Sequence, residues 1–127
     1  MELVDLMKSI SCNSIPHFLI LYGEEQKIID IYIQNIVQSV EGKRVVVDNV
    51  SQAIKDNGKK SLYKSIKVYV VTEDTAFLNK DESWENVRKS MHKNYLILRY
   101  HSLDKRSAFV KKNQQNIVEF SHLSDEV

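Results

Sequence analysis

The hydrophobic pattern changes its period several times along this chain. Short runs in which almost every residue is apolar alternate with longer stretches in which apolar residues recur every three or four positions. A continuous apolar run is typical of a strand that is buried on both faces of a parallel sheet. These runs predict five strands, at residues 17–22, 44–48, 66–71, 95–98 and 117–120.

The stretches with helical spacing predict the elements that connect those strands. Apolar residues at i, i+3, i+4 and i+7 mark a first helix over residues 3–10, and a stripe through Ile29 and Ile33 marks a second over residues 25–40. Three further helices are expected, namely a brief one from its N-cap Ser51 to Asn57, one through Trp84, Val87, Arg88 and Met91 that starts at Asp81 or Ser83, and one at about 105–114.

Strands that alternate with helices form βαβ units, whose right-handed crossovers cover both faces of a parallel sheet. The sequence therefore predicts an α/β fold with a doubly wound, mainly parallel five-stranded sheet and helices on both faces. With 127 residues, of which 43% are hydrophobic, the chain has the size of one domain. It stops soon after the last strand without a clear closing helix, and we expect residues 1–127 to be one domain of a longer protein.

The composition excludes several classes of protein. The longest uncharged apolar run, residues 15–23, is far shorter than the roughly 20 residues that a membrane-spanning helix needs, and residues 1–5 do not form a basic leader. We therefore expect a cytoplasmic protein with no membrane partner. Cys12 is the only cysteine, which excludes an internal disulfide and a cysteine-cluster metal site.

The turn after the first strand is where a sheet of this class most often binds a nucleotide. A phosphate-binding loop needs two glycines, a lysine and then a serine or threonine. Residues 22–28 have the sequence Tyr-Gly-Glu-Glu-Gln-Lys-Ile, so Gly23 is the only glycine, no hydroxyl follows Lys27, and two carboxylates lie where phosphates would bind. Glu24 and Glu25 instead suit the positive end of a helix dipole. We therefore expect no cofactor here.

Other candidate catalytic groups are weakly supported. Asp48, Glu73 and Asp74 follow the second and third strands, where nucleotide hydrolases of this layout keep their acids, but we expect them to be solvated loop residues. The four histidines lack the i, i+4 spacing that would place two of them on one metal; they are His17, His92, His101 and His122. The sequence indicates a binding module without enzymatic activity. A divergent nucleotide hydrolase that uses Asp48 or Asp74 remains the enzyme alternative.

The net charge of +1 conceals an uneven distribution. Residues 1–54 carry 4 basic and 7 acidic side chains, residues 55–112 carry 14 and 7, and residues 113–127 carry none and 3. A basic middle section either binds a polyanion or an acidic protein surface, or it consists of ordinary solvated faces. A nucleic-acid-binding module would use its basic side chains together with neighbouring tyrosines. The candidates are Lys59, Lys60, Lys64, Lys67, Arg99, Lys105, Arg106, Lys111 and Lys112, with Tyr63, Tyr69 and Tyr100.

Ser61, Leu62 and Tyr63 form a short segment between lysines, just ahead of the third predicted strand. An adjacent aliphatic and aromatic residue can act as an anchor that fills a hydrophobic pocket of a partner protein. Alternatively, Leu62 and Tyr63 close the core edge of the short helix before them. Their spacing alone leaves both interpretations open.

Several segments together resemble the delta subunit of the bacterial DNA polymerase III clamp loader, and most closely its bacteriophage-type members. The resemblance covers nearly the whole chain. It rests on residues 18–25 (Phe-Leu-Ile-Leu-Tyr-Gly-Glu-Glu), 61–63 (Ser-Leu-Tyr) before 66–71 (Ile-Lys-Val-Tyr-Val-Val), 95–98 (Tyr-Leu-Ile-Leu), 103–107 (Leu-Asp-Lys-Arg-Ser) and 117–120 (Ile-Val-Glu-Phe).

The resemblance implies the N-terminal, AAA+-like domain of a delta subunit that keeps a P-loop fold without a functional phosphate loop. It implies no catalysis of its own, but binding to the sliding clamp, opening of the clamp for loading onto primed DNA, and contacts with other clamp-loader subunits and, indirectly, with DNA. Ser61, Leu62 and Tyr63 match the family's clamp-binding motif, with Tyr63 in the aromatic position. The candidates for contacts with DNA or neighbouring subunits are Lys59, Lys60, Lys64, Lys105 and Arg106. Residues 103–107 either make such subunit contacts or only cap a helix, and the sequence leaves both interpretations open.

Overall fold

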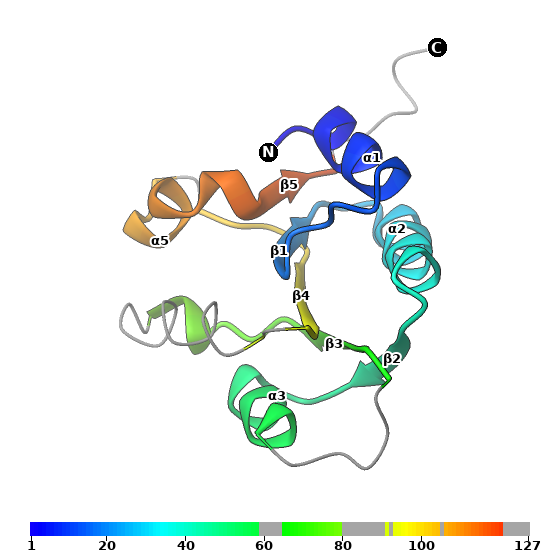
Figure 1. Ribbon diagram of the computed structural model, residues 1–127. Helices are drawn as coiled ribbons and strands as arrows, with labels where there is room; N and C mark the ends of the chain where they lie inside the picture. Colours follow the sequence, from blue (N-terminus) through cyan, green and yellow to red (C-terminus); the bar gives the residue numbers. More distant parts are fainter. Residues whose placement is uncertain (59–64, 80–90, 92, 105, 121–127) are drawn as a thin grey trace.

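The computed structural model describes residues 1–58, 65–79, 91, 93–104 and 106–120. Its centre is a single five-stranded sheet in the order β2-β3-β4-β1-β5, and every neighbouring pair of strands is parallel (Figure 1). The strands are β1 (Phe18–Tyr22), β2 (Lys43–Val46), β3 (Lys67–Thr72), β4 (Tyr95–Tyr100) and β5 (Ile117–Glu119). The predicted parallel α/β sheet is therefore confirmed.

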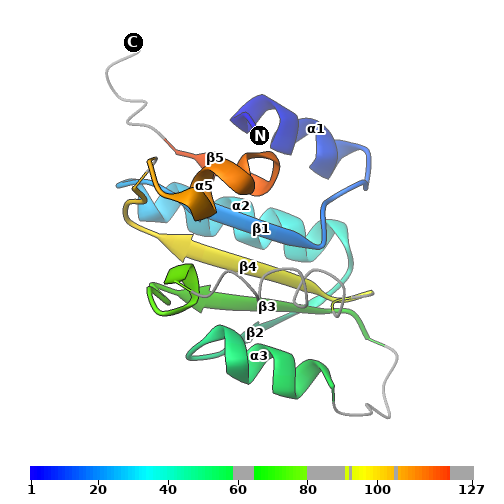
Figure 2. The same ribbon diagram turned by 90° about the vertical axis from the view of Figure 1, so that its left-hand side faces the viewer.

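Helical elements cover both faces of this sheet. They are α1 (Leu3–Ser11), α2 (Gln26–Ser39), α3 (Val50–Asn57) and α5 (Ala108–Lys112), with short 3-10 helices at η1 (Phe77–Asn79) and η2 (Gln114–Asn116). Apolar residues of α1 and α2 pack on one face, and those of α3, η1 and α5 pack on the other (Figures 1 and 2). The doubly wound arrangement follows because each crossover helix must bury its apolar stripe against the sheet.

Burial of β1 on both faces explains its uninterrupted apolar sequence. All five of its residues are buried, with Leu19 and Leu21 facing the α1 and α2 layer while Phe18, Ile20 and Tyr22 face the α3 and α5 layer. Successive side chains of a strand point to opposite faces, so a central strand between two helical layers needs apolar residues at every position.

Local boundaries differ from the sequence prediction at several elements: β2 ends at Val46 and not at residue 48, β4 extends to Tyr100, and two helices differ as well. The N-cap of α3 is Asn49 and not Ser51, because the Asn49 Oδ1 atom accepts the backbone N–H of Gln52 at 2.8 Å and the helix begins at Val50. The helix expected at 105–114 is shorter, since Ser107 caps it and it ends at Lys112. The helix expected through Trp84, Val87 and Arg88 lies outside the described residues. Within the described ranges, no helix has the length and apolar character needed to cross a bilayer.

Candidate functional site

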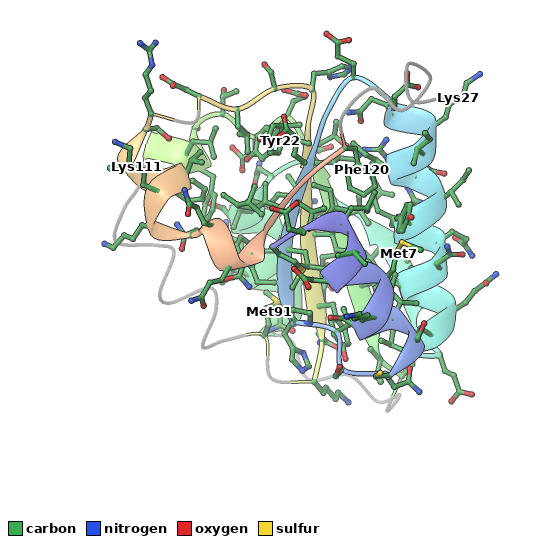
Figure 3. All side chains as sticks on the ribbon, turned by 90° about the horizontal axis from the view of Figure 1, so that it is seen from above. Met7, Tyr22, Lys27, Met91, Lys111 and Phe120 are labelled. Atoms are coloured by element: carbon green, nitrogen blue, oxygen red, sulfur yellow. The ribbon has the colours of Figure 1, made fainter. Side chains whose placement is uncertain are left out.

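The turn at Gly23 lies at the carboxyl end of β1, beside the end of β5. The Phe120 N–H donates to the Tyr22 carbonyl at 2.8 Å, and the Gly23 N–H donates to the Tyr100 carbonyl at 3.1 Å. Gly23 has a φ of +149°, and a Cβ atom on it would lie 2.2 Å from the Phe120 carbonyl oxygen. Figure 3 shows Tyr22 and Phe120 at the same end of the sheet. Close approach of two backbone segments, and not phosphate binding, therefore accounts for this glycine.

Three backbone donors at the start of α2 have acceptors within the turn. The Gln26 N–H donates to the Glu24 carbonyl at 3.0 Å, and those of Ile28 and Ile29 donate to the Glu25 carbonyl at 3.1 and 3.2 Å. In a phosphate loop, such N–H groups point at the anion. Here they are turned inward, while the carboxylates of Glu24 and Glu25 add negative charge to the same turn. These three N–H groups are therefore engaged within the turn, beside two carboxylates that disfavour a bound phosphate.

The side chain of Gln26 occupies the space between the ends of β1 and β4. Its Nε2 atom donates to the carbonyls of Gly23 at 2.6 Å and Tyr100 at 3.1 Å. Its Oε1 atom accepts two hydrogen bonds from the Arg99 guanidinium, at 3.2 Å from Nε and 3.0 Å from Nη2. The amide thus ties the turn to β4. Sequence reasoning did not single out Gln26.

Arg99 also belongs to an ion-pair cluster on the α2 face. Its Nη1 atom lies 3.2 Å from the Asp30 carboxylate, and the Nη2 atom of Arg44 lies 2.7 Å from the same oxygen. The Arg44 hydrogen bond is the main cause that lowers the pKa of Asp30; Arg99 adds to it, while partial burial opposes it. With a side chain only 14% exposed, Arg99 is a structural cation that links α2 to the sheet and is not presented to nucleic acid.

Asp74 is a half-buried capping group rather than the solvated loop residue that the sequence predicted. Its Oδ2 atom accepts the Val50 N–H at the start of α3 at 2.9 Å, and its Oδ1 atom accepts the Phe77 N–H at 3.1 Å. The hydroxyl of Tyr100 donates to the Asp74 carbonyl at 2.8 Å. Asp48, in contrast, is exposed, as expected. Asp74 therefore joins α3, η1 and β4, and its carboxylate oxygens are already engaged.

The structure brings no metal-binding cluster together in the part of the chain that it describes. His17 stacks on Tyr95 with ring centroids 4.3 Å apart, and His101 lies 2.9 Å from the Glu73 carboxylate. Cys12 is exposed. His92 and His122 lie outside the described residues.

The basic candidates are divided among different environments. Lys67 pairs with Asp56 at 3.4 Å, whereas Arg106, Lys111 and Lys112 are exposed. Figure 3 shows Lys111 on α5. Arg106 is 92% exposed and lies 3.5 Å from Asp104. Lys59, Lys60, Lys64 and Lys105 fall outside the described residues. Tyr69 and Tyr100 are core residues, at 0% and 1% exposure, and therefore present no ring for base stacking.

Ser61, Leu62 and Tyr63 also lie outside the described residues. The chain on either side of them is described, at the end of α3 and the beginning of β3. In Figure 2 these two ends lie at the amino ends of the strands, opposite the arrowheads. The residues that flank segment 61–63 therefore lie at the end of the sheet opposite the Gly23 turn.

No protein-family model matches the chain, and no curated protein matches it by sequence. Among solved structures, the DNA clamp loader delta protein (YqeN) of Bacillus subtilis superposes with a TM-score of 0.70 over 97% of this chain, at 19% sequence identity. The chain spans 43% of the length of that protein. The expected likeness to a clamp-loader delta protein is therefore confirmed at the level of the fold.

Proposed function

We propose that this chain is a non-catalytic clamp-loader domain of the delta type, which binds a sliding clamp and helps to open it for loading onto DNA. The observation that carries the proposal is the shared fold with the B. subtilis delta protein over almost the entire chain. The assignment to bacteriophage-type members remains a prediction from the sequence.

The chemistry of the Gly23 turn supports a role without nucleotide hydrolysis. Gln26 and the backbone of Phe120 fill the positions around the turn, and Asp74 is committed to backbone N–H groups. A domain of this fold that does not bind ATP acts through its surfaces. ATP-dependent work then falls to partner subunits of the loader.

Ser61, Leu62 and Tyr63 are the proposed contact with the clamp. An apolar pair of this kind contributes most when both side chains enter a pocket and exclude water. The Tyr63 hydroxyl then needs a polar partner or a water molecule, because a buried hydroxyl without one is costly. Lys60, which precedes the motif, adds a charge that a clamp surface with acidic groups would favour.

The test measures the affinity of the whole chain for a purified candidate host clamp by isothermal titration calorimetry. The double variant Leu62→Ala/Tyr63→Ala should weaken binding by about thirtyfold or more, which corresponds to the ~2 kcal/mol of a buried anchor. The matched control is Val4→Ala/Met7→Ala, which removes two apolar side chains of α1 that are 55% and 50% exposed. If Leu62→Ala/Tyr63→Ala bound the clamp as tightly as the wild type does, the proposed contact would be refuted.

Direct binding to nucleic acid is the second candidate, and the exposed Arg106, Lys111 and Lys112 favour it. Such binding would appear in the absence of a clamp and would weaken steeply with salt, because cations that contact phosphates displace counterions. Fluorescence anisotropy with primed DNA at two salt concentrations separates this function from clamp docking. Arg106→Ala/Lys111→Ala/Lys112→Ala should reduce DNA affinity and leave clamp affinity unchanged.

A further inference from the structure

The strand β2 lies at one side of the described sheet, where β3 is its neighbour (Figure 1). The N–H groups of Lys43 and Val47 donate toward the β3 side, at 2.8 and 3.2 Å. Along a strand, the backbone groups of successive residues point alternately to its two sides. Those of Arg44 and Val46 therefore point away from β3, to the side on which the described sheet has no further strand. A strand edge of this kind can pair with another chain.

The side chains along this edge alternate between the two faces of the sheet. Val45 and Val47 pack in the apolar cluster that includes α3, so Arg44, Val46 and, by the same alternation, Asp48 belong to the other face. Val46 is 72% exposed, more than any other large apolar residue in the described part of the chain, and Asp48 is exposed as well. The edge therefore presents a cation, an apolar side chain and a carboxylate, in that order, on one face.

A second copy of the chain is complementary to this edge in one antiparallel register. In an antiparallel pair, residues that exchange backbone hydrogen bonds lie directly opposite each other. If Val46 lies opposite Val46 of the second copy, Arg44 lies opposite Asp48 of that copy, and both kinds of pair are favourable. Registers centred on Arg44 or Asp48 would place like charges opposite each other, and those centred on Val45 or Val47 would place Val46 opposite a charged residue.

The existing contacts of Arg44 and Asp48 are compatible with that register. The Arg44 guanidinium contacts Asp30 through its Nη2 atom at 2.7 Å, and a planar group with five N–H donors can also serve a second carboxylate. The Asp48 N–H donates to the Oε1 atom of the exposed Gln52 at 2.8 Å. In the antiparallel pair, the Arg44 carbonyl of the second copy would take the position of that amide oxygen. The N–H group would thus exchange one acceptor for another.

We propose that β2 is an interface between two copies of this chain, in which the two β2 strands pair antiparallel about Val46. Such a two-fold contact is self-complementary and joins the two sheets into one. One short strand from each copy buries less than the roughly 1,200 Å² of a stable complex, so the association is weak and depends on concentration. It uses no residue of the proposed clamp contact, and the two interactions are therefore tested separately.

Sedimentation equilibrium of the whole chain, from about 10 µM to about 1 mM, measures this association. The average mass of the wild type should rise with concentration. Val46→Lys, which places two ammonium groups at the centre of the contact, should weaken the association by about tenfold or more. Asp48→Lys should also weaken it, because a lysine would then lie opposite Arg44. The matched control is Ile31→Lys on α2, where the native residue is 58% exposed, and this variant should associate as the wild type does.

Disulfide cross-linking tests the register. Directly opposite residues that exchange hydrogen bonds have Cα atoms about 5.5 Å apart, within the range of roughly 4.4–6.8 Å that a disulfide spans. Because Cys12 is the only cysteine, Val46→Cys can be studied in a Cys12→Ser background. Mild oxidation should convert this variant to a covalent dimer much faster than it converts Ile31→Cys in the same background.

A monomeric mass at every concentration would overturn the inference, including the case in which a different protein supplies the added strand. Equal rates of cross-linking for the Val46→Cys and Ile31→Cys chains would overturn it too, as would lysine variants at Val46 and Asp48 that associate like the control. Rapid cross-linking of Val46→Cys, together with weakened association of both lysine variants, would support pairing through β2.

Discussion

The carbonyl oxygen of Phe120 lies where a side chain on Gly23 would begin. A Cβ atom at this position would approach that oxygen to 2.2 Å, and the φ of +149° is one that L-residues rarely adopt. We therefore expect Gly23→Ala to lower the free energy of unfolding by about 2 kcal/mol or more, since strain and a backbone clash add together. Urea denaturation followed by circular dichroism measures the loss.

Gly58 provides the matched control for that substitution. It follows α3 in a helical conformation, and the nearest atoms to an added Cβ lie 3.6 Å away. Gly58→Ala should therefore be neutral or should stabilise the protein by up to about 1 kcal/mol, through reduced freedom of the unfolded chain. Equal losses at the two glycines would contradict the role of the Phe120 contact.

Asp74 should behave as a structural capping residue. Asp74→Ala leaves the Val50 and Phe77 N–H groups without their carboxylate acceptor, and we expect a loss of about 2 kcal/mol or more. The exposed Asp48 is the comparison, and Asp48→Ala should change the free energy of unfolding by less than about 0.5 kcal/mol. Denaturation curves for both variants decide the matter. If Asp74 tolerated the change as well as Asp48, the capping role would be wrong.

Asp30 should give the fold a stability that is lost in acid. Its carboxyl pKa is lower in the folded protein than the ordinary 3.8, chiefly because of Arg44. A group with a depressed pKa contributes its full stabilisation above the unfolded value and loses it as the pH falls through the folded value. The difference in unfolding free energy between wild type and Asp30→Asn should therefore be constant near neutral pH and shrink below about pH 4.

Arg44→Gln tests the cause of that effect. Without the Arg44 guanidinium, which lies 2.7 Å from the carboxylate, the pKa of Asp30 should rise. An NMR titration of the Asp30 carboxyl in both proteins measures the change directly. An unchanged pKa in the variant would mean that Arg99, and not Arg44, lowers the pKa of Asp30.

Nucleotides should have no effect on thermal stability. The Gln26 amide bridges Gly23, Tyr100 and Arg99, and the carboxylates of Glu24 and Glu25 add negative charge at the same turn, which disfavours a phosphate. We expect no shift of the melting temperature with millimolar ATP and magnesium, and no heat on titration. A ligand present at 100 times its Kd would raise the free energy of unfolding by about 2.7 kcal/mol, so even a modest affinity would shift the melting temperature visibly.

The fold could be predicted from the sequence because burial on two faces leaves a strong signal. The run from Phe18 to Tyr22 is apolar at every position, and this pattern indicates a central parallel strand. The stripe through Ile29 and Ile33 likewise indicates the helix α2, since both residues are buried against the sheet. Both signals come from solvent exclusion and need no knowledge of specific partners.

The polar contacts could not be predicted in the same way. Gln26 has no distinguishing neighbours in the sequence, and its role depends on Arg99, which is 73 residues away. Asn49 and Ser51 are both good N-caps, and tertiary packing at Val50 selects the former. Asp74 did leave a signal: an acid three residues before Phe77 is the spacing at which a carboxylate caps a short helical turn. The spacing could have indicated this role.

The Gly23 turn and the residues that flank segment 59–64 lie at opposite ends of the strands. β5 ends beside Gly23, at the carboxyl ends of the strands, whereas the residues that flank segment 59–64 lie at the amino ends. Strands of five or six residues are roughly 17–20 Å long, and this length separates the two ends. The hydrogen-bonded parallel strands therefore keep the Gly23 turn and the residues that flank segment 59–64 this far apart.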